Sequence, residues 1–119
     1  MQVEQVDFVT VPTQDVERAV AWYRDVLGLP VSEHTDGEVE APNVTLSFWN
    51  PESQGLELKP NEAGFALRVA DVEEARKELE AKGVEFMGET YDSSVCLMGF
   101  LKDPDGNTVI LHRRYKRRG

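Results

Sequence analysis

A short motif occurs twice in this chain, and the spacing of its two copies is the strongest constraint on the fold. The segment DVERA at residues 15–19 recurs as DVEEA at residues 71–75, 56 residues later. Each copy follows a short β-type run and ends about three turns later at a glycine, Gly28 or Gly83. Two copies are too few for a solenoid, which needs three or more repeats. The sequence therefore predicts two related half-domains that share one core.

Each copy of the motif predicts an amphipathic helix. In the first, apolar residues recur at the i, i+3, i+4, i+7 spacing from Val16 to Leu27. We expect Asp15 to cap this helix and Gly28 to end it. In the second, Asp71 and the glutamate three residues later have capping-box spacing. Both halves therefore have one helix with a defined start and end.

Strands are expected around these helices. Strand-type runs between Pro-, Gly- and Asn-bearing loops occupy residues 6–11, 29–33, 44–49 and 56–59 in the first half, and residues 65–69, 84–87, 95–101 and 108–111 in the second. The Asp-Pro-Asp-Gly sequence at residues 103–106 is a strong turn signal. One helix can cover only one face of four strands, so the uncovered faces must meet each other or enclose a hollow.

We therefore expect one α+β domain over residues 1–119. It consists of two βαβββ modules, at residues 1–60 and 64–112, and a basic tail at residues 113–119. The length is that of a single domain with one hydrophobic core.

Composition narrows the classes of function. The absence of an apolar run of about 18 residues argues against a membrane span, and the first residues lack the regions of an export signal. A single cysteine, Cys96, rules out an internal disulfide and fits a reducing compartment, so we expect a cytoplasmic protein. The net charge is −9, and five of the 13 basic residues lie at positions 112–119. Because the remaining acidic body repels phosphate backbones, no nucleic-acid partner is expected.

With these elements placed, the chain resembles the vicinal oxygen chelate superfamily, which includes glyoxalase I, extradiol dioxygenases, fosfomycin-resistance enzymes and bleomycin-resistance proteins. The resemblance rests on the duplicated βαβββ pattern, on WYRDVLGL at residues 22–29 and on DPDGN at residues 103–107, and it covers residues 5–112. It implies an open, barrel-like sheet of eight strands around a cavity. In enzymatic members a divalent metal is held at four positions, namely the start of the first strand and the middle of the last strand of each half.

Laid on this sequence, the four metal-binding positions are Phe8, Glu57, Gly64 and Ile110. Three of them have no donor atom in the side chain, whereas divalent ions need several oxygen, nitrogen or sulfur ligands. A shift of one residue brings in Asp7, but it turns the side chain to the opposite face of the strand. We therefore expect no metal and no cofactor, and we disfavour a metal-dependent lyase or dioxygenase.

Strand alternation gives the residues expected to face the cavity. The candidate ligand-binding residues are Phe8, Thr10, Trp49, Glu57, Arg68, Met98, Phe100, Ile110 and His112. Together they describe an apolar pocket with a few polar groups, which is the usual composition of a small-molecule site. Glu57 is the one candidate for a catalytic residue, because an apolar hollow favours a carboxyl group that keeps its proton. The alternative for Glu57 is an ordinary ion pair with Arg68 or Lys59.

The main hypothesis is a metal-independent protein that binds a small, partly aromatic or amphipathic molecule, such as a drug or a metabolite. It resembles the bleomycin-resistance branch, which lacks the metal and binds its drug at a dimer interface. The acidic body favours a cationic ligand by long-range attraction. A homodimer is also expected, by this resemblance and because an open sheet has exposed edges.

Two alternatives remain. The first is a metal-dependent lyase, isomerase or dioxygenase with a displaced ligand set, such as Glu57, His112 and Asp7. The second is a non-catalytic interaction subunit whose hollow is filled by its own side chains, among them Phe8, Met98, Phe100 and Ile110.

Overall fold

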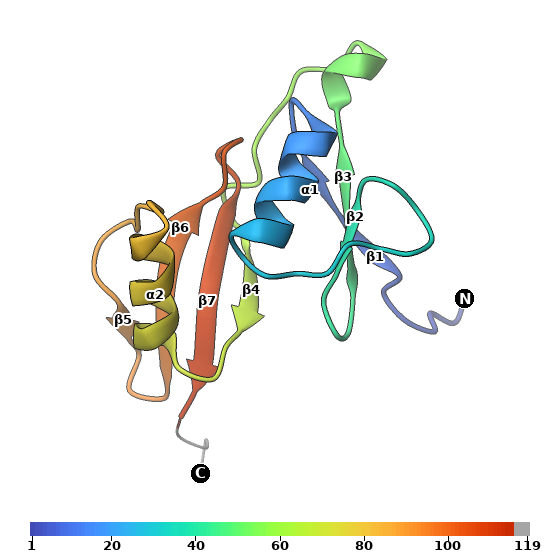
Figure 1. Cartoon of the computed structure of the whole chain (residues 1–119). Coiled ribbons are helices and arrows are strands. Elements are labelled where there is room, and N and C mark those ends of the chain that lie inside the picture. Colours follow the sequence, from blue (N-terminus) through green and yellow to red (C-terminus); the bar gives the residue numbers. More distant parts are fainter. Residues whose placement is uncertain (116–119) are drawn as a thin grey trace. The chain divides into compact units, whose positions relative to one another are not determined.

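In the computed structural model, which describes residues 1–115, the two copies of the motif form helices of equal length (Figure 1). Helix α1 is Val16–Asp25 and helix α2 is Val72–Ala81, with 10 residues each. The Asp15 carboxylate accepts a hydrogen bond from the backbone N–H of Arg18 at 3.1 Å, and Asp71 accepts one from that of Glu74 at 3.0 Å. These bonds satisfy N–H groups that the first helical turn leaves free. Both predicted helix caps are confirmed.

The chain divides into two compact units, Met1–Pro60 and Asn61–Gly119. The first, unit one, has a sheet in the order β1-β3-β2. Its strands are β1 (Phe8–Pro12), β2 (Glu38–Glu40) and β3 (Thr45–Trp49), followed by the short 3-10 helix η1 (Pro51–Gln54). Strand β3 runs parallel to β1 and antiparallel to β2.

Helix α1 contacts β2 and β3 and covers one face of the unit-one sheet. The core between helix and sheet consists of the fully or nearly buried side chains of Val11, Ala19, Tyr23, Val39, Leu46 and Phe48. The ring of Tyr23 lies 4.8 Å from that of Phe48, between centroids. Burying one such large side chain stabilises a fold by about 1.5–3 kcal/mol.

The second unit, unit two, has a sheet in the order β4-β7-β6-β5. Its strands are β4 (Phe65–Arg68), β5 (Tyr91–Asp92), β6 (Cys96–Lys102) and β7 (Thr108–Arg114). Strand β7 runs parallel to β4 and antiparallel to β6. Helix α2 contacts β6 and β7, and its Val72 and Leu79 share a core with Leu101, Val109 and Leu111.

The structure confirms the α+β class and corrects several strands. The runs at 29–33 and 84–87 contribute only isolated bridges, Val31 to Val39 and Phe86 to Leu101. Residues 56–59 form no strand: the backbone N–H of Leu56 donates to the carbonyl of Pro51 at 3.0 Å and closes η1 instead. Strands β2 and β5 were not predicted. Within the described residues there are thus seven strands in two sheets, and neither sheet is closed.

The C-terminal segment also differs from the prediction. Arg113 and Arg114 belong to β7 and do not start a separate tail. Residues 116–119 of the predicted basic tail lie outside the described residues. In the part that is described, no helix has the length and apolar character needed to cross a membrane.

Candidate functional site

The sheet of unit two has one face that no element of its own unit covers. Strand register places side chains from three strands on this face, because residues directly opposite each other point the same way. Arg68 of β4 lies opposite His112 of β7, and His112 lies opposite Met98 of β6. Phe100 lies opposite Ile110. Met98, Phe100, Ile110 and His112 thus share one sheet face, as strand alternation predicted.

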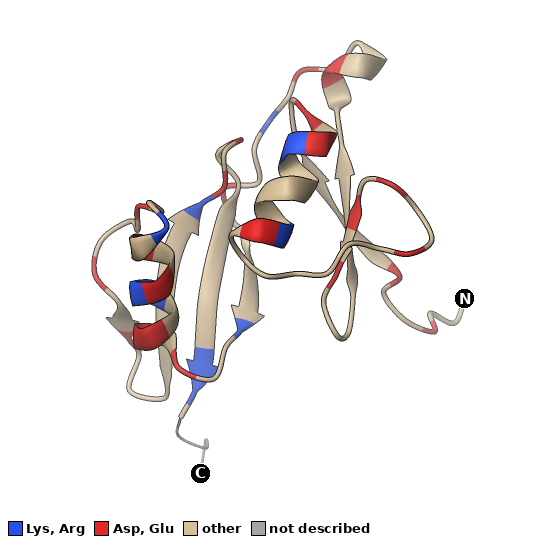
Figure 2. Ribbon diagram, in the orientation of Figure 1, with Lys and Arg blue, Asp and Glu red and all other residues tan. Residues whose placement is uncertain are grey.

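This face combines an apolar floor with basic groups. Met98, Phe100 and Ile110 are each partly exposed, His112 is half-buried and Arg68 is exposed. Arg68 ends β4 and Arg114 ends the parallel strand β7, so both strands end in basic residues (Figure 2). Neither Arg68 nor His112 forms an ion pair with another described residue of unit two. The guanidinium group of Arg68 is therefore available to an acidic group of a ligand.

The sheet of unit one also has a face that α1 leaves uncovered. Phe8 lies opposite Thr45 and Thr10 lies opposite Ser47, while Trp49 follows two residues after Ser47 on the same face. Phe8 and Trp49 remain 56% and 40% exposed. The predicted site residues Phe8, Thr10 and Trp49 thus share one sheet face.

Strand pairing also identifies which residue of unit one corresponds to Ile110. Thr10 and Ala66 are 56 residues apart, the spacing of the duplicated motif. Ala66 lies opposite Ile110 in the parallel pair of unit two, and Thr10 lies opposite Ser47 in the parallel pair of unit one. The counterpart of Ile110 is therefore Ser47. The prediction that Glu57 takes this position is wrong.

Glu57 lies in the irregular segment after η1 and is exposed. It forms no ion pair with Lys59 or any other described residue of unit one. Its carboxylate has neither a strand to orient it nor an apolar wall around it. This environment removes the reason for considering Glu57 a catalytic residue.

Enzymatic members of the superfamily that the chain resembles hold a divalent metal at four positions. The residues at these positions of this chain do not fit such a metal. They are Phe8 and Ser47 in unit one and Gly64 and Ile110 in unit two, and only the serine carries a donor atom, a weak one. Gly64 also cannot be replaced easily by a ligand residue. Its φ is +84°, and a Cβ atom there would lie 2.8 Å from the carbonyl oxygen of Thr108. Across residues 1–115, no three His, Cys, Asp or Glu side chains are grouped so that they could hold a metal ion.

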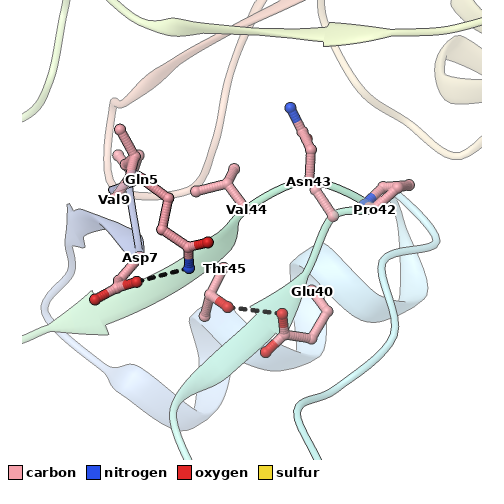
Figure 3. A pocket seen from close by; sticks show the side chains of 10 residues that line it. Gln5, Asp7, Val9, Glu40, Pro42, Asn43, Val44 and Thr45 are labelled. Atoms are coloured by element: carbon pink, nitrogen blue, oxygen red, sulfur yellow. Dashed lines mark hydrogen bonds between the residues drawn. The ribbon is translucent and has the colours of Figure 1, made fainter. Parts of the chain in front are cut away.

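A hollow of about 510 Å³ lies in unit one, where β1 begins and β2 turns into β3 (Figure 3). Its lining consists of Gln5, Val6, Asp7, Val9, Glu40, Ala41, Pro42, Asn43, Val44 and Thr45. One Glu40 carboxylate oxygen accepts a hydrogen bond from the Thr45 hydroxyl at 2.7 Å, and Asp7 accepts one from the side-chain amide of Gln5 at 2.8 Å.

This hollow was not predicted from the sequence. Asp7 was considered only as a displaced metal ligand, and neither Glu40 nor Thr45 was a candidate site residue. The signal that was present is the Pro-Asn pair at residues 42–43, a two-residue hairpin turn that brings Glu40 opposite Thr45.

Comparisons with known proteins support the fold. The sequence profile of a family described as the Glyoxalase/Bleomycin resistance protein/Dioxygenase superfamily matches residues 5–111. No curated protein matches the chain. Among solved structures, TnmS3, an antibiotic binding protein from Streptomyces sp. CB03234, is 22% identical with a TM-score of 0.80, over 97% of this chain and 99% of that chain.

Two further solved structures are similar. Lactoylglutathione lyase from Agrobacterium tumefaciens is 18% identical with a TM-score of 0.77, over 93% of this chain and 94% of that chain. A member of the same superfamily from Sphaerobacter thermophilus DSM 20745 is 24% identical with a TM-score of 0.77, over 92% and 97% of the two chains. At these identities the likenesses show a common fold, and the predicted fold is confirmed.

Proposed function

Because this chain belongs to the Glyoxalase/Bleomycin resistance protein/Dioxygenase superfamily, we propose that it binds a small molecule without a metal ion. One observation carries the proposal. At the four positions where enzymatic members of the superfamily hold their metal, this chain has Phe8, Ser47, Gly64 and Ile110, which offer almost no donor atoms. Similar folds include both an antibiotic binding protein and a lactoylglutathione lyase, so the fold by itself does not decide between binding and catalysis.

The uncovered face of unit two is the proposed seat of the ligand. An aromatic or aliphatic body packs on Met98, Phe100 and Ile110, and burial of about 100 Å² of their surface contributes roughly 2.5 kcal/mol. A carboxylate or sulfate on the same ligand reaches Arg68, and a hydrogen bond to a charged group adds about 1.5–3 kcal/mol. His112, opposite Arg68, offers a second polar contact.

The aromatic pair Phe8 and Trp49, with Thr10 between them, is proposed as a further contact surface on unit one. Their exposure supports this role, since large apolar side chains left in water are favoured sites for ligand contact. We also propose a homodimer and a cytoplasmic location. The open sheets and the single, buried, free Cys96 support these two points.

Thermal-shift and calorimetric screening of the full chain in the presence of EDTA tests the proposal. The panel contains aromatic carboxylates, amphipathic sulfates and cationic glycopeptide drugs. We expect at least one aromatic carboxylate or amphipathic sulfate to bind saturably in EDTA and to bind at least tenfold more weakly to the Arg68→Gln variant. The Arg113→Gln variant is the matched control, because Arg113 lies on β7 but on the opposite sheet face.

Binding that appears only after a divalent metal is added would instead support the metal-dependent alternative. The absence of binding by every compound would favour an interaction subunit whose own side chains occupy the site.

A further inference from the structure

The hollow of unit one lies where unit two has a network of buried polar groups. In both units the last two strands form a hairpin, and the segment before the first strand approaches the hairpin turn. In unit two this turn is residues 103–107, and in unit one it is residues 41–44. The backbone bonds that close the turns correspond: Asp103 N–H donates to the Asn107 carbonyl at 2.9 Å, and Ala41 N–H donates to the Val44 carbonyl at 3.0 Å.

In unit two, polar side chains fill the space between the turn and the approaching segment. Asn107, fully buried, donates its side-chain N–H to Asp103 at 2.8 Å and accepts the backbone N–H of Asn61 at 2.8 Å. Asp103 also accepts the backbone N–H groups of Asp105 and Asn107, both at 2.9 Å. The Asn61 carbonyl accepts the N–H of Thr108 at 2.9 Å. This clamp fixes the segment that leads into β4.

In unit one the same positions cannot form such a clamp. Ala41 stands where Asp103 stands, and Val44 stands where Asn107 stands; neither side chain has a polar atom. Gln5, the counterpart of Asn61 at the 56-residue spacing, binds Asp7 through its side chain instead. The hollow of about 510 Å³ therefore borders a turn that lacks the buried polar network of unit two.

The charged side chains that line the hollow favour a cationic ligand. Val6, Val9 and Val44 supply apolar lining, Asp7 and Glu40 supply carboxylates, and no Lys, Arg or His lines it. Thr45 binds one oxygen of Glu40, while the other oxygen has no hydrogen-bond or ion-pair partner among the described residues. The volume falls in the range of small-molecule pockets, about 300–1,000 Å³, and far exceeds that of a single ion.

We propose that this hollow is a second binding site, which takes the ammonium or guanidinium group of a small organic cation with an apolar body. Glu40 accepts the charged N–H group through its free oxygen, and the apolar part of the cation packs on the valine side chains. Binding in this hollow does not depend on the uncovered face of unit two. An experiment can therefore disprove one of the two proposed sites and leave the other standing.

Titration of the ¹⁵N-labelled full chain with benzylammonium chloride, followed by amide chemical shifts, tests this proposal. Sodium benzoate and benzyl alcohol serve as the anionic and neutral probes of the same size. We expect saturable shifts with benzylammonium at Asp7, Ala41, Val44 and Thr45. The shifts of the same four residues should report binding at least tenfold weaker for the other two probes. No saturable shift with benzylammonium, shifts with it that map outside the lining, or equal binding of benzoate at these four residues would each overturn the proposal.

The same titration with two glutamate variants tests the role of Glu40. Glu40→Gln keeps an acceptor for the Thr45 hydroxyl but removes the charge, so we expect benzylammonium to bind about tenfold more weakly. Glu38→Gln is the matched control, because Glu38 lies on the same strand and does not line the hollow. Equal effects of the Glu38 and Glu40 variants would contradict the assignment.

Discussion

The two units of this chain begin alike and end differently. Both start with a strand and a 10-residue helix that is capped by aspartate, 56 residues apart. Unit two then forms strands β6 and β7 of seven residues each, joined by a turn with a buried Asp103–Asn107 network. Unit one forms strands of three and five residues, joined by a turn with alanine and valine where unit two has Asp103 and Asn107. The comparison indicates that the two halves share the helix signals and the strand faces but not the turn chemistry, and that the hollow borders the turn without the buried network.

The uncovered sheet faces of the two units also differ in charge. In unit one this face bears Glu38 and Glu40, whereas in unit two it bears Arg68, His112 and Arg114. The net charge of −9 therefore does not describe either face alone.

The largest expected effect separates the two turns. Asn107→Ala removes the buried side-chain hydrogen bonds to Asp103 and to the Asn61 N–H, so we expect the free energy of unfolding to fall by about 3 kcal/mol. Val44→Ala, at the corresponding position, should lower it by about 1 kcal/mol or less. Urea unfolding followed by circular dichroism measures both. Equal losses would mean that the turns are equivalent in energy and would break the comparison.

A second test concerns two glycines with similar backbone angles. Gly64→Ala places a Cβ atom 2.8 Å from the Thr108 carbonyl oxygen at a φ of +84°, and we expect a loss of about 2–3 kcal/mol. Gly28→Ala has a φ of +76° but no atom within 4 Å of the new methyl group, so about 1 kcal/mol is expected. Thermal unfolding of both variants distinguishes them. A smaller loss at Gly64 would show that this position accepts a side chain, and with it a metal ligand.

A third, smaller effect concerns the helix of unit two. The Arg76 guanidinium lies 4.7 Å from the ring centroid of Phe86 and donates to the Gly88 carbonyl at 2.9 Å and the Thr90 hydroxyl at 3.2 Å. The corresponding residue of α1, 56 positions earlier, is Val20, which has none of these bonds. We expect Arg76→Ala to cost about 1–2 kcal/mol. The exposed neighbour Lys77→Ala should change stability by less than about 0.5 kcal/mol in the same urea experiment, and a similar loss for both would contradict a specific role of Arg76.

The smallest effect is a pH dependence found at the end of unit two. The Tyr115 hydroxyl donates to Asp92 and, with the Ser94 N–H, holds the pKa of Asp92 below its ordinary value. The same hydrogen bond raises the pKa of Tyr115. The Asp92 contribution to stability is therefore present above the unfolded pKa of the carboxyl group and is lost as pH falls through the lower folded value. The Tyr115 contribution is lost as pH rises through its raised folded pKa.

NMR titration of the Asp92 side-chain carboxyl carbon measures this pKa directly. In the Tyr115→Phe variant we expect the pKa of Asp92 to rise toward that of a free aspartate. An unchanged value would show that the hydrogen bond to Tyr115 does not persist in solution.

The helices and strand faces were predictable because their signals are local. Asp15 and Asp71 cap helices through hydrogen bonds that span only three residues. The alternation of side chains between the two faces of β6 and β7 follows from the order of neighbouring residues alone. The side-chain set of the unit-two face, including Met98, Phe100 and His112, followed from that alternation.

The predictions that failed depended on which strands pair. The Leu-Glu-Leu-Lys run at residues 56–59 alternates like a strand, but β3 already takes the place beside β1, so these residues remain outside the sheet. Strand β2 was missed because two of its three residues are glutamates, which rarely favour strands. The hollow was missed for the same reason, since it borders the β2–β3 turn. Which strands pair depends on all the strands of a sheet together, so it cannot be read from the local pattern of one segment.

The metal content of the full chain, purified without chelator and then titrated with Mn²⁺, Ni²⁺, Fe²⁺ and Zn²⁺, tests the central claim most directly. Elemental analysis should find no stoichiometric ion, and the amide shifts of Phe8, Ser47, Gly64 and Ile110 should not change in a saturable way. One tightly bound ion per chain that perturbs those four residues would contradict the account and return metal-dependent catalysis to first place.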